Sequence, residues 1–251
     1  MVEHPAVNRG VVGSSPTRGA TPRRVLAIDI GGSGLKASLI DDTGRLVVPR
    51  LRVDTPVGEP PRQIVQALVR LVAPLRGYEC VAVGFPGVVR RGRVFTAVNL
   101  HHEGWKGFDL AHALEQALGK PVRVANDADM QGLAAIKGKG VEMVITLGTG
   151  FGTGLYLDGR LAPHLELGHH PFRKGETYEE QLGHEALRRV GTRKWNRRLK
   201  KAIRHIRALT TFDHLYIGGG NARKVHLDLD PDVSLIDNDA GLRGGAALWR
   251  D

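Results

Sequence analysis

Short apolar runs separated by glycine-rich turns occupy most of the chain, and one arrangement of them occurs twice. From Val25 onward, the segments VLAIDIGG, LKASLID and RLVVPRLRV are divided by Gly and Asp-Thr-Gly turn signals, which predicts a meander of strands. The later segment MVITLGTGFGTGLYLDGRLA repeats the order of strand, glycine-rich turn, strand and Gly-Arg-Leu turn. The repetition predicts duplicated architecture.

Helices and buried strands fill the chain between the two repeats. RQIVQALVRLVAPL has apolar residues at helical spacing, and FDLAHALEQALGK predicts a second helix with Asp109 as its N-cap and Gly119 as its stop. CVAVGFPG predicts a buried strand, and VRVANDADMQGLAAIKGKG predicts a strand, a polar turn and a helix.

The glycine-rich turns are suited to binding phosphate. In a dinucleotide fingerprint the glycines precede a helix, whereas the segments that follow them here, LKASLI and TGLYL, are expected strands. A glycine-rich hairpin lets backbone N–H groups approach phosphate oxygens, because glycine has no Cβ in the way. Ordinary tight turns would explain one such hairpin, but two in matching contexts favour phosphate binding.

Composition indicates the charge of the ligand and the cellular compartment of the protein. Lys and Arg number 36 against 26 Asp and Glu, so the formal net charge of +10 favours an anionic ligand, although a GC-rich genome would also yield an arginine-rich chain. The single cysteine, Cys80, excludes an intrachain disulfide and fits a reducing cytosol. The sequence has neither an apolar stretch of about 18 residues nor a signal-peptide core, so we expect a cytoplasmic protein with no membrane partner.

Six motifs together carry a family resemblance. DIGGSGLKASLID, VGFPGVVRRGRV, NDADMQGLA, LGTGFGTGLYLDG, ELGHH and LYIGGGNARK resemble the ROK sugar kinases of the hexokinase–actin superfamily, most closely their polyphosphate glucokinase branch. The resemblance implies an α/β fold of two duplicated ribonuclease H-like lobes with a cleft between them. We expect a disordered extension or start-site artefact at 1–24, an N-terminal lobe at 25–126 and a C-terminal lobe at 127–251, whose last helix packs back on the first lobe.

The resemblance also implies the site residues. Asp127 matches the base that takes a proton from the sugar 6-hydroxyl, although Asp127 or Asp129 would also serve as the N-cap of the next helix. Asp29 is expected to hold Mg²⁺ through water, or else to cap its own turn. Sugar contacts are implied for Asn99, Asn126, Asp127, Glu166, His169 and either Glu179 or Glu180, of which Glu180 is the candidate. Phosphate contacts are implied for Asp29, Gly31, Gly32, Ser33, Gly34, Lys36, Gly148, Thr149, Gly150, Thr153, Gly218, Gly219 and Gly220, the last three matching an adenosine-binding motif.

One segment lacks a feature that is common in the family, and another is unusually basic. Many ROK proteins carry a cysteine-rich zinc loop, but PFRKGETYEEQLG contains no cysteine, so we expect no structural zinc. The segment TRKWNRRLKKAIRHIRAL combines an apolar stripe with many basic residues, and its polar face is either simply solvated or a track for polyphosphate. Nucleic acid is not expected as a partner, because no recognition helix or aromatic platform is recognisable.

The resemblance implies a homodimeric glucokinase that uses Mg²⁺ and transfers a phosphoryl group from polyphosphate and/or ATP to the 6-hydroxyl of glucose. The alternatives are an ATP-dependent ROK kinase for another hexose or an N-acetylated amino sugar, and a non-catalytic, sugar-binding ROK regulator. The residues before Val25 are too few and too rich in Gly and Pro for the helix-turn-helix domain of a ROK transcription factor.

Overall fold

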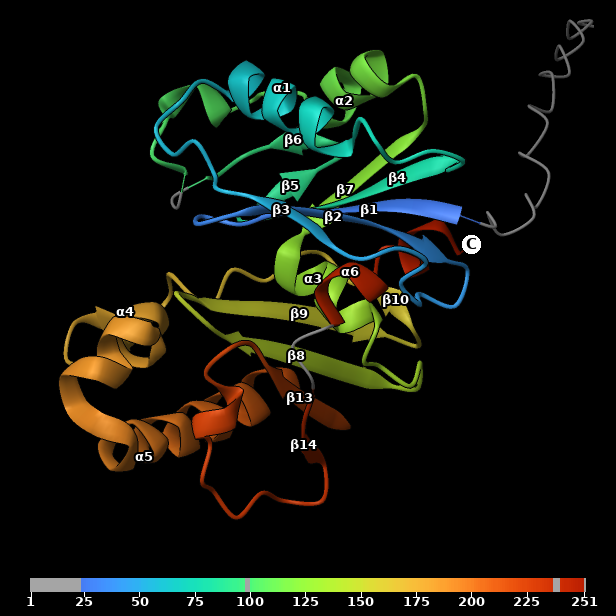
Figure 1. Ribbon diagram of the computed structural model, residues 1–251. Coiled ribbons are helices and arrows are strands. Elements are labelled where there is room, and N and C mark those ends of the chain that lie inside the picture. Colours follow the sequence, from blue (N-terminus) through green and yellow to red (C-terminus); the bar gives the residue numbers. More distant parts are fainter. Residues whose placement is uncertain (1–23, 98–99, 237–239, 251) are drawn as a thin grey trace, which may run out of the picture.

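Two five-stranded sheets of the same topology form the framework of the protein (Figure 1). The structure is a computed structural model that describes residues 24–97, 100–236 and 240–250. The first sheet, of order β3-β2-β1-β4-β7, contains β1 (Arg24–Ile30), β2 (Leu35–Asp41), β3 (Leu51–Val53), β4 (Cys80–Phe85) and β7 (Val122–Asn126). The second sheet, of order β10-β9-β8-β13-β14, contains β8 (Val141–Leu147), β9 (Phe151–Leu157), β10 (Arg160–Leu161), β13 (His214–Gly218) and β14 (Val233–Leu235).

Strand direction is duplicated as well as strand order. The first three strands of each sheet form an antiparallel meander, and the remaining two continue the sheet in parallel. This pattern confirms the duplicated α/β fold. The expected extension, apart from Arg24, and the candidate Asn99 lie outside the described residues.

The first sheet is covered on both faces, which explains its nearly continuous apolar strands. Leu26 and Ile28 of β1 pack in one cluster with α1 (Pro61–Val72) and α2 (Leu110–Leu118). The helix α2 has the predicted caps, since the Asp109 side chain accepts a hydrogen bond from His112 N and Gly119 is left-handed at φ 64°. Ala27 faces the opposite way, into a cluster with Met130 and Leu242.

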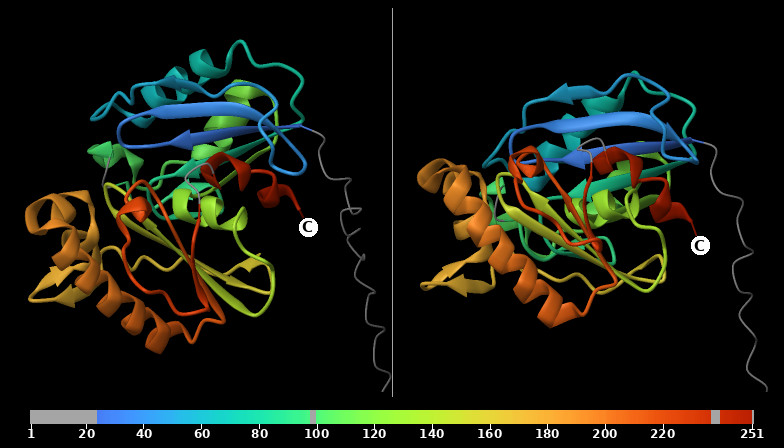
Figure 2. Two further views of the ribbon diagram at one scale, coloured as in Figure 1. Left: turned by 60° about the horizontal axis from the view of Figure 1, so that its bottom comes forward. Right: turned by 90° about the horizontal axis from the view of Figure 1, so that it is seen from below.

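A short helix joins the two lobes. The helix α3 (Asp127–Leu133) contacts β4 and β7 of the first sheet and β8 and β9 of the second. The helix α6 (Ala240–Arg243) packs against α3, β1 and β2, so the C-terminal segment lies beside the first sheet (Figure 2). Gly244 permits this approach, because a Cβ there would lie 1.6 Å from Met130 O.

A helical arm flanks the second sheet. It consists of β11 (Pro171–Arg173), β12 (Glu176–Thr177), α4 (Tyr178–Leu182) and α5 (His184–Thr210), which has a non-helical residue at Gly191. The predicted apolar stripe of α5 is buried in the core of this lobe, including Trp195, Leu199 and Ile206. The remaining short elements are β5 (Val89–Arg90), β6 (Arg93–Val94), η2 (Glu103–Trp105), η3 (Ala222–Lys224) and η4 (Ala247–Trp249). Among the described residues, none of the helices is both long enough and apolar enough to cross a bilayer.

Candidate active site

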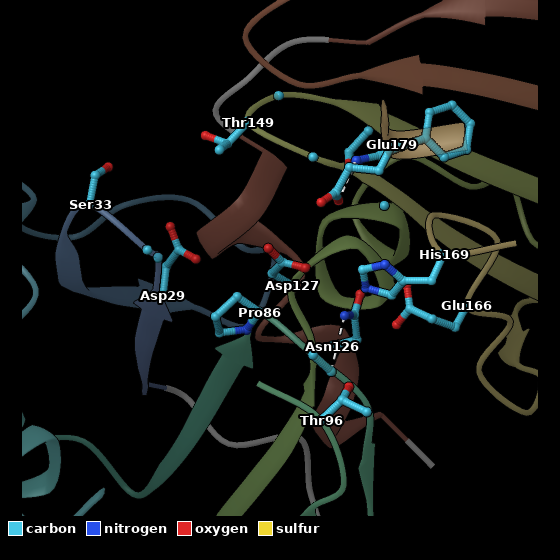
Figure 3. A pocket seen from close by; sticks show the side chains of 18 of the residues that line it. Asp29, Ser33, Pro86, Thr96, Asn126, Asp127, Thr149, Glu166, His169 and Glu179 are labelled. Carbon is cyan, nitrogen blue, oxygen red and sulfur yellow. Dashed lines mark hydrogen bonds between the residues drawn. The ribbon is translucent and has the colours of Figure 1, made fainter. Parts of the chain in front are cut away.

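A cavity of about 490 Å³ lies between the two lobes, lined by both glycine hairpins (Figure 3). Figure 3 shows Asp127 between Asp29 on one side and His169 and Glu166 on the other. The structure brings together these predicted residues in the lining: Asp29, Gly31, Gly32, Ser33, Lys36, Asn126, Asp127, Gly148, Thr149, Gly150, Glu166 and His169.

The β1–β2 turn is the first hairpin at the cavity. Gly31 N donates to Gly34 O at 3.0 Å and closes the turn, and Thr55 Oγ1 donates to Gly31 O at 2.6 Å. The N–H groups of Gly32 and Ser33 have no acceptor among the described residues. They are therefore free to bind an anion.

The β8–β9 turn is the second hairpin. Asn221 braces it, because its side-chain amide donates to Gly148 O at 3.0 Å, and the first residue of α5 donates its N–H to Thr149 O at 3.2 Å. Within the described part of the chain, the N–H groups of Thr149 and Gly150 find no acceptor. Both hairpins thus present backbone donors to one cavity, as an anionic ligand requires.

Asp127 is the first residue of α3, but it is not the N-cap. Asn126 has that role, since its Oδ1 accepts from Ala128 N at 2.9 Å and Asp129 N at 3.3 Å. The other end of the Asn126 amide donates to Gly87 O at 3.1 Å, which holds the strand end in place. The alternative in which Asp127 or Asp129 serves as the cap is therefore wrong.

The surroundings of Asp127 shift its titration towards neutral pH. Burial and the negative charge of Asp29 raise the pKa of Asp127 to about 7, with smaller contributions from Asp129 and Glu166, although the N–H of Ala128 opposes the shift. A carboxylate with such a pKa is suited to accept a proton near neutral pH.

The raised pKa of Asp127 predicts a pH-dependent cost in stability. Above pH 7 the folded protein carries the unfavourable charge, whereas below pH 4 the carboxyl is neutral in the folded and unfolded states. Asp127→Asn should therefore raise the free energy of unfolding at pH 8 by as much as about 4 kcal/mol, with the gain vanishing near pH 4. Urea unfolding at both pH values measures this, and an equal difference at both would contradict the shift.

A histidine between two carboxylates fixes the opposite wall of the cavity. His164 Nδ1 lies 2.9 Å from Asp129 Oδ2, and Nε2 lies 3.2 Å from Glu166 Oε2. Burial alone would lower the pKa of His164, but the hydrogen bonds to Asp129 and Glu166 outweigh it and raise the pKa to about 9. The imidazolium is therefore charged at neutral pH. Burial opposes ionisation of Glu166, yet the hydrogen bond from His164 and the charges of His164 and His169 hold the pKa of Glu166 below its usual range.

Several predicted residues do not line the cavity. Glu180 is one, because its carboxylate accepts from Thr177 N at 2.8 Å in a capping box; its neighbour Glu179 lines the cavity instead and accepts from Phe151 N at 3.3 Å. Thr153 is buried and donates its hydroxyl to Leu165 O, so it cannot reach a phosphate. The assignments of Glu180 and Thr153 are corrected accordingly.

Two of the predicted glycines outside the lining have packing roles. A Cβ at Gly34 would lie 2.8 Å from the Arg52 side chain, and one at Gly219 would lie 2.4 Å from Leu147 O. Gly219 also has φ 87°, so the turn after β13 requires glycine for its own conformation. Gly218 and Gly220 likewise lie outside the cavity lining, and their contact with adenosine stays a prediction.

The family motifs do not indicate His164, and they leave Glu179 and Glu180 as neighbouring candidates, of which Glu179 lines the cavity. His164 lies two residues before Glu166, where side chains of an extended segment point to the same side, and that spacing was the available signal. The choice between Glu179 and Glu180 depends on where α4 begins, which the sequence leaves open by one residue.

Comparison with known proteins identifies the family. The model of the ROK family matches residues 25–184. Polyphosphate glucokinase of Mycobacterium tuberculosis is 32% identical over 235 residues, covering 90% of this chain and 87% of its own. The crystal structure of inorganic polyphosphate/ATP-glucomannokinase from Arthrobacter sp. strain KM superposes with a TM-score of 0.80 at 31% identity, covering 90% of this chain and 97% of that one. N-acetylmannosamine kinase of Shigella boydii is 38% identical over 142 residues, covering 54% of this chain and 48% of its own.

The fold and the site together define a two-lobed kinase of the hexokinase–actin type. The chain belongs to the ROK family. It is a phosphotransferase of that family's sugar kinases.

Proposed function

We propose that the protein is a glucokinase that transfers a phosphoryl group from inorganic polyphosphate and/or ATP to the 6-hydroxyl of glucose. One observation carries the proposal: Asp127, with a pKa of about 7, lies in a single cavity with two hairpins whose backbone N–H groups are free to bind phosphate. The relationship to polyphosphate glucokinase supports the choice of glucose and of polyphosphate.

Different cavity residues would bind the sugar, accept the proton and hold the donor phosphates. Glu166, His169 and the remaining N–H of the Asn126 side-chain amide would hydrogen-bond to the sugar hydroxyls, which both donate and accept. Asp127 would orient the 6-hydroxyl and take its proton as the oxygen attacks the terminal phosphorus of the donor. The bond from that phosphorus to its bridging oxygen breaks, and the donor leaves one phosphate shorter. The two hairpins would hold the donor phosphates, with the proton remaining on Asp127 until product leaves.

A divalent cation fits beside Asp29. Its carboxylate lines the cavity at the end of β1, and its Oδ2 is 2.9 Å from Lys36 Nζ, which leaves Oδ1 for a hydrated ion. One carboxylate plus donor phosphates is a usual environment for Mg²⁺. When bound, Mg²⁺ would offset the negative charge on the phosphoryl group. Lys36 would supply further positive charge on the same side.

The test is a coupled assay for sugar phosphate with purified protein. Glucose, mannose, N-acetylmannosamine and N-acetylglucosamine are each offered with ATP and with polyphosphate. We expect the highest kcat/KM with glucose, and turnover with polyphosphate. A higher kcat/KM with an N-acetylated sugar would contradict glucose as the substrate. Turnover with ATP but not with polyphosphate would contradict polyphosphate as a donor.

A second candidate is a kinase for an N-acetylated amino sugar. The observation that favours it is the 38% identity to N-acetylmannosamine kinase, which exceeds the identity to the glucokinase but covers about half of the chain. The match to polyphosphate glucokinase covers more of the chain and therefore favours glucose as the substrate. The assay with the four sugars distinguishes the two candidate functions.

We also infer a homodimer in the cytoplasm, from the family resemblance and the single cysteine. Size-exclusion chromatography with light scattering measures the oligomeric state.

The pH dependence of turnover should follow Asp127. With the donor saturating, kcat/KM for glucose should fall on the acid side with an apparent pKa near 7, because protonated Asp127 cannot accept the hydroxyl proton. The value at pH 6 should be roughly ten times lower than at pH 8. An acid limb near pH 4 would mean that Asp127 is not the base or that its pKa is ordinary.

A further inference from the structure

A second pocket is lined by basic side chains alone. Its volume is about 290 Å³, and its lining consists of Arg173, Lys174, Lys194, Arg197, Arg198 and Lys201. The first two belong to the β11–β12 hairpin, and the other four share one face of α5 at helical spacing. We call it the cationic pocket.

The pocket differs from an ordinary solvated helix face. The sequence indicates a basic stripe along α5, but the structure adds a second wall, the hairpin, and leaves Arg204 outside the lining. Figure 2 shows the hairpin beside α4 and α5. The charges therefore converge on one concave surface instead of pointing away from each other.

Two of the guanidinium groups are held in place without losing charge. Arg173 Nη1 donates to Gln181 Oε1 at 2.9 Å, and Arg198 Nη1 donates to Gln181 O at 3.3 Å. Gln181 is buried, so it provides a fixed anchor. Both acceptors are neutral, and none of the ion pairs among the described residues involves a cation of this pocket.

The uncompensated charge has an energetic cost. Burial and the neighbouring charges of Arg173 and Arg189 lower the pKa of Arg198 below its usual value, although the charge of Glu176 opposes the shift. Polyanions relieve such repulsion by pairing with several cations at once. The arrangement is therefore typical of a site whose stabilising anion is supplied by a ligand.

The helical arm connects the pocket to the active-site cavity. In α4, Glu179 lines the cavity, whereas Gln181, two residues later, anchors the arginines of the pocket. The first N–H of α5 donates to Thr149 O in the second phosphate hairpin. Lys194 follows ten residues later in α5, beyond the non-helical residue Gly191. Because the arm joins the second phosphate hairpin to the pocket, a long phosphate chain is the donor suited to occupy both.

We propose that the cationic pocket binds a distal segment of a polyphosphate chain whose terminal phosphate lies between the two glycine hairpins. The proposal rests on the proposed function, because it takes polyphosphate as the donor. It makes the pocket a binding site specific to long donors, separate from the sites of sugar and of ATP.

The test compares two triple variants with equal change in charge. Lys194→Gln, Arg197→Gln and Lys201→Gln together remove three cations of the pocket and spare Arg173 and Arg198, which make the hydrogen bonds to Gln181. The matched control, Arg193→Gln, Lys200→Gln and Arg204→Gln, removes three exposed cations of α5 that lie outside the pocket. Thermal unfolding checks that both variants fold like the parent.

Two measurements distinguish polyphosphate binding at the pocket from catalysis in the cavity. Equilibrium binding of fluorescently labelled long-chain polyphosphate, measured without sugar, should weaken by about tenfold or more in the pocket variant, with a salt dependence flatter by about 2 in log–log slope for three lost contacts. The KM for long polyphosphate should rise similarly, while the KM values for ATP and glucose stay unchanged. The control variant should show much smaller changes.

Each other outcome overturns a distinct claim. Equal weakening in both variants would mean diffuse attraction to a basic surface and no site. Unchanged binding in the pocket variant would refute the site but leave the kinase proposal intact. If the parent binds polyphosphate at the pocket but uses only ATP as donor, the donor assignment fails, and the claim that the bound chain continues into the hairpins fails with it. Tighter binding of a single-stranded oligonucleotide than of polyphosphate, lost in the pocket variant, would assign the pocket to nucleic acid instead.

Discussion

Replacing Asp127 with asparagine should lower kcat for sugar phosphorylation by about a hundredfold or more, the usual scale for removing a general base. Asparagine keeps the shape of the side chain and can still accept the hydrogen bond from Ala128 N, which measures 2.8 Å in the parent. It cannot take a proton. The loss should therefore appear in kcat, while glucose affinity, measured by calorimetry, changes little.

A matched control for this variant is Asp109→Asn. Asp109 also lies at the start of a helix, where its Oδ1 accepts from His112 N at 3.0 Å, but it lies outside the cavity between the hairpins. Asparagine is an equally good N-cap, so kcat should remain near that of the parent. If Asp127→Asn also retains most of its kcat, Asp127 is only part of the helix terminus and the proposed mechanism is wrong.

Glu166→Gln should raise the KM for glucose by roughly 5- to 150-fold, the equivalent of about 1 to 3 kcal/mol for a buried polar group that loses its partner. The substitution removes the negative charge that accepts from His164, so the imidazolium keeps Asp129 as its remaining anionic partner. Both the sugar contact and the orientation of the loop would suffer. Steady-state kinetics at saturating donor measures the effect.

Glu180→Gln is the control for the sugar site, because Glu180 caps α4 and does not line the cavity. Its KM for glucose should match that of the parent, although its stability should fall slightly. His169→Ala should behave like Glu166→Gln. A Glu166→Gln variant that alters only the KM of the phosphate donor would contradict the assignment of Glu166 to the sugar.

The duplicated fold was predictable because it rests on local signals. Glycine turns, alternating apolar strands and helix caps such as Asp109 and Gly119 depend on residues close in sequence, and each is found where the pattern predicts it. The pairing of Asp127 with two glycine hairpins was predictable only through the ordered set of family motifs. Neither hairpin by itself distinguishes a phosphate site from a tight turn.

What the sequence could not predict depends on exact register and on distant contacts. Glu179 and Glu180 are adjacent, and only the start of α4 decides which faces the cavity and which caps the helix. The bridge from Asp129 through His164 to Glu166 joins residues up to 37 positions apart in the sequence. The cationic pocket similarly requires the β11–β12 hairpin to meet α5, a contact that periodicity along one helix cannot show.

The most direct measurement is identification of the product by phosphorus NMR, with the parent protein and Asp127→Asn in parallel reactions containing glucose, Mg²⁺ and either polyphosphate or ATP. If Asp127 is the base of a sugar kinase, the glucose 6-phosphate resonance should grow in the reaction with the parent protein as the donor is consumed. In the reaction with Asp127→Asn, that resonance should remain near background. Absence of any sugar phosphate from the parent with both donors, or its formation at equal rates by both proteins, would contradict the account.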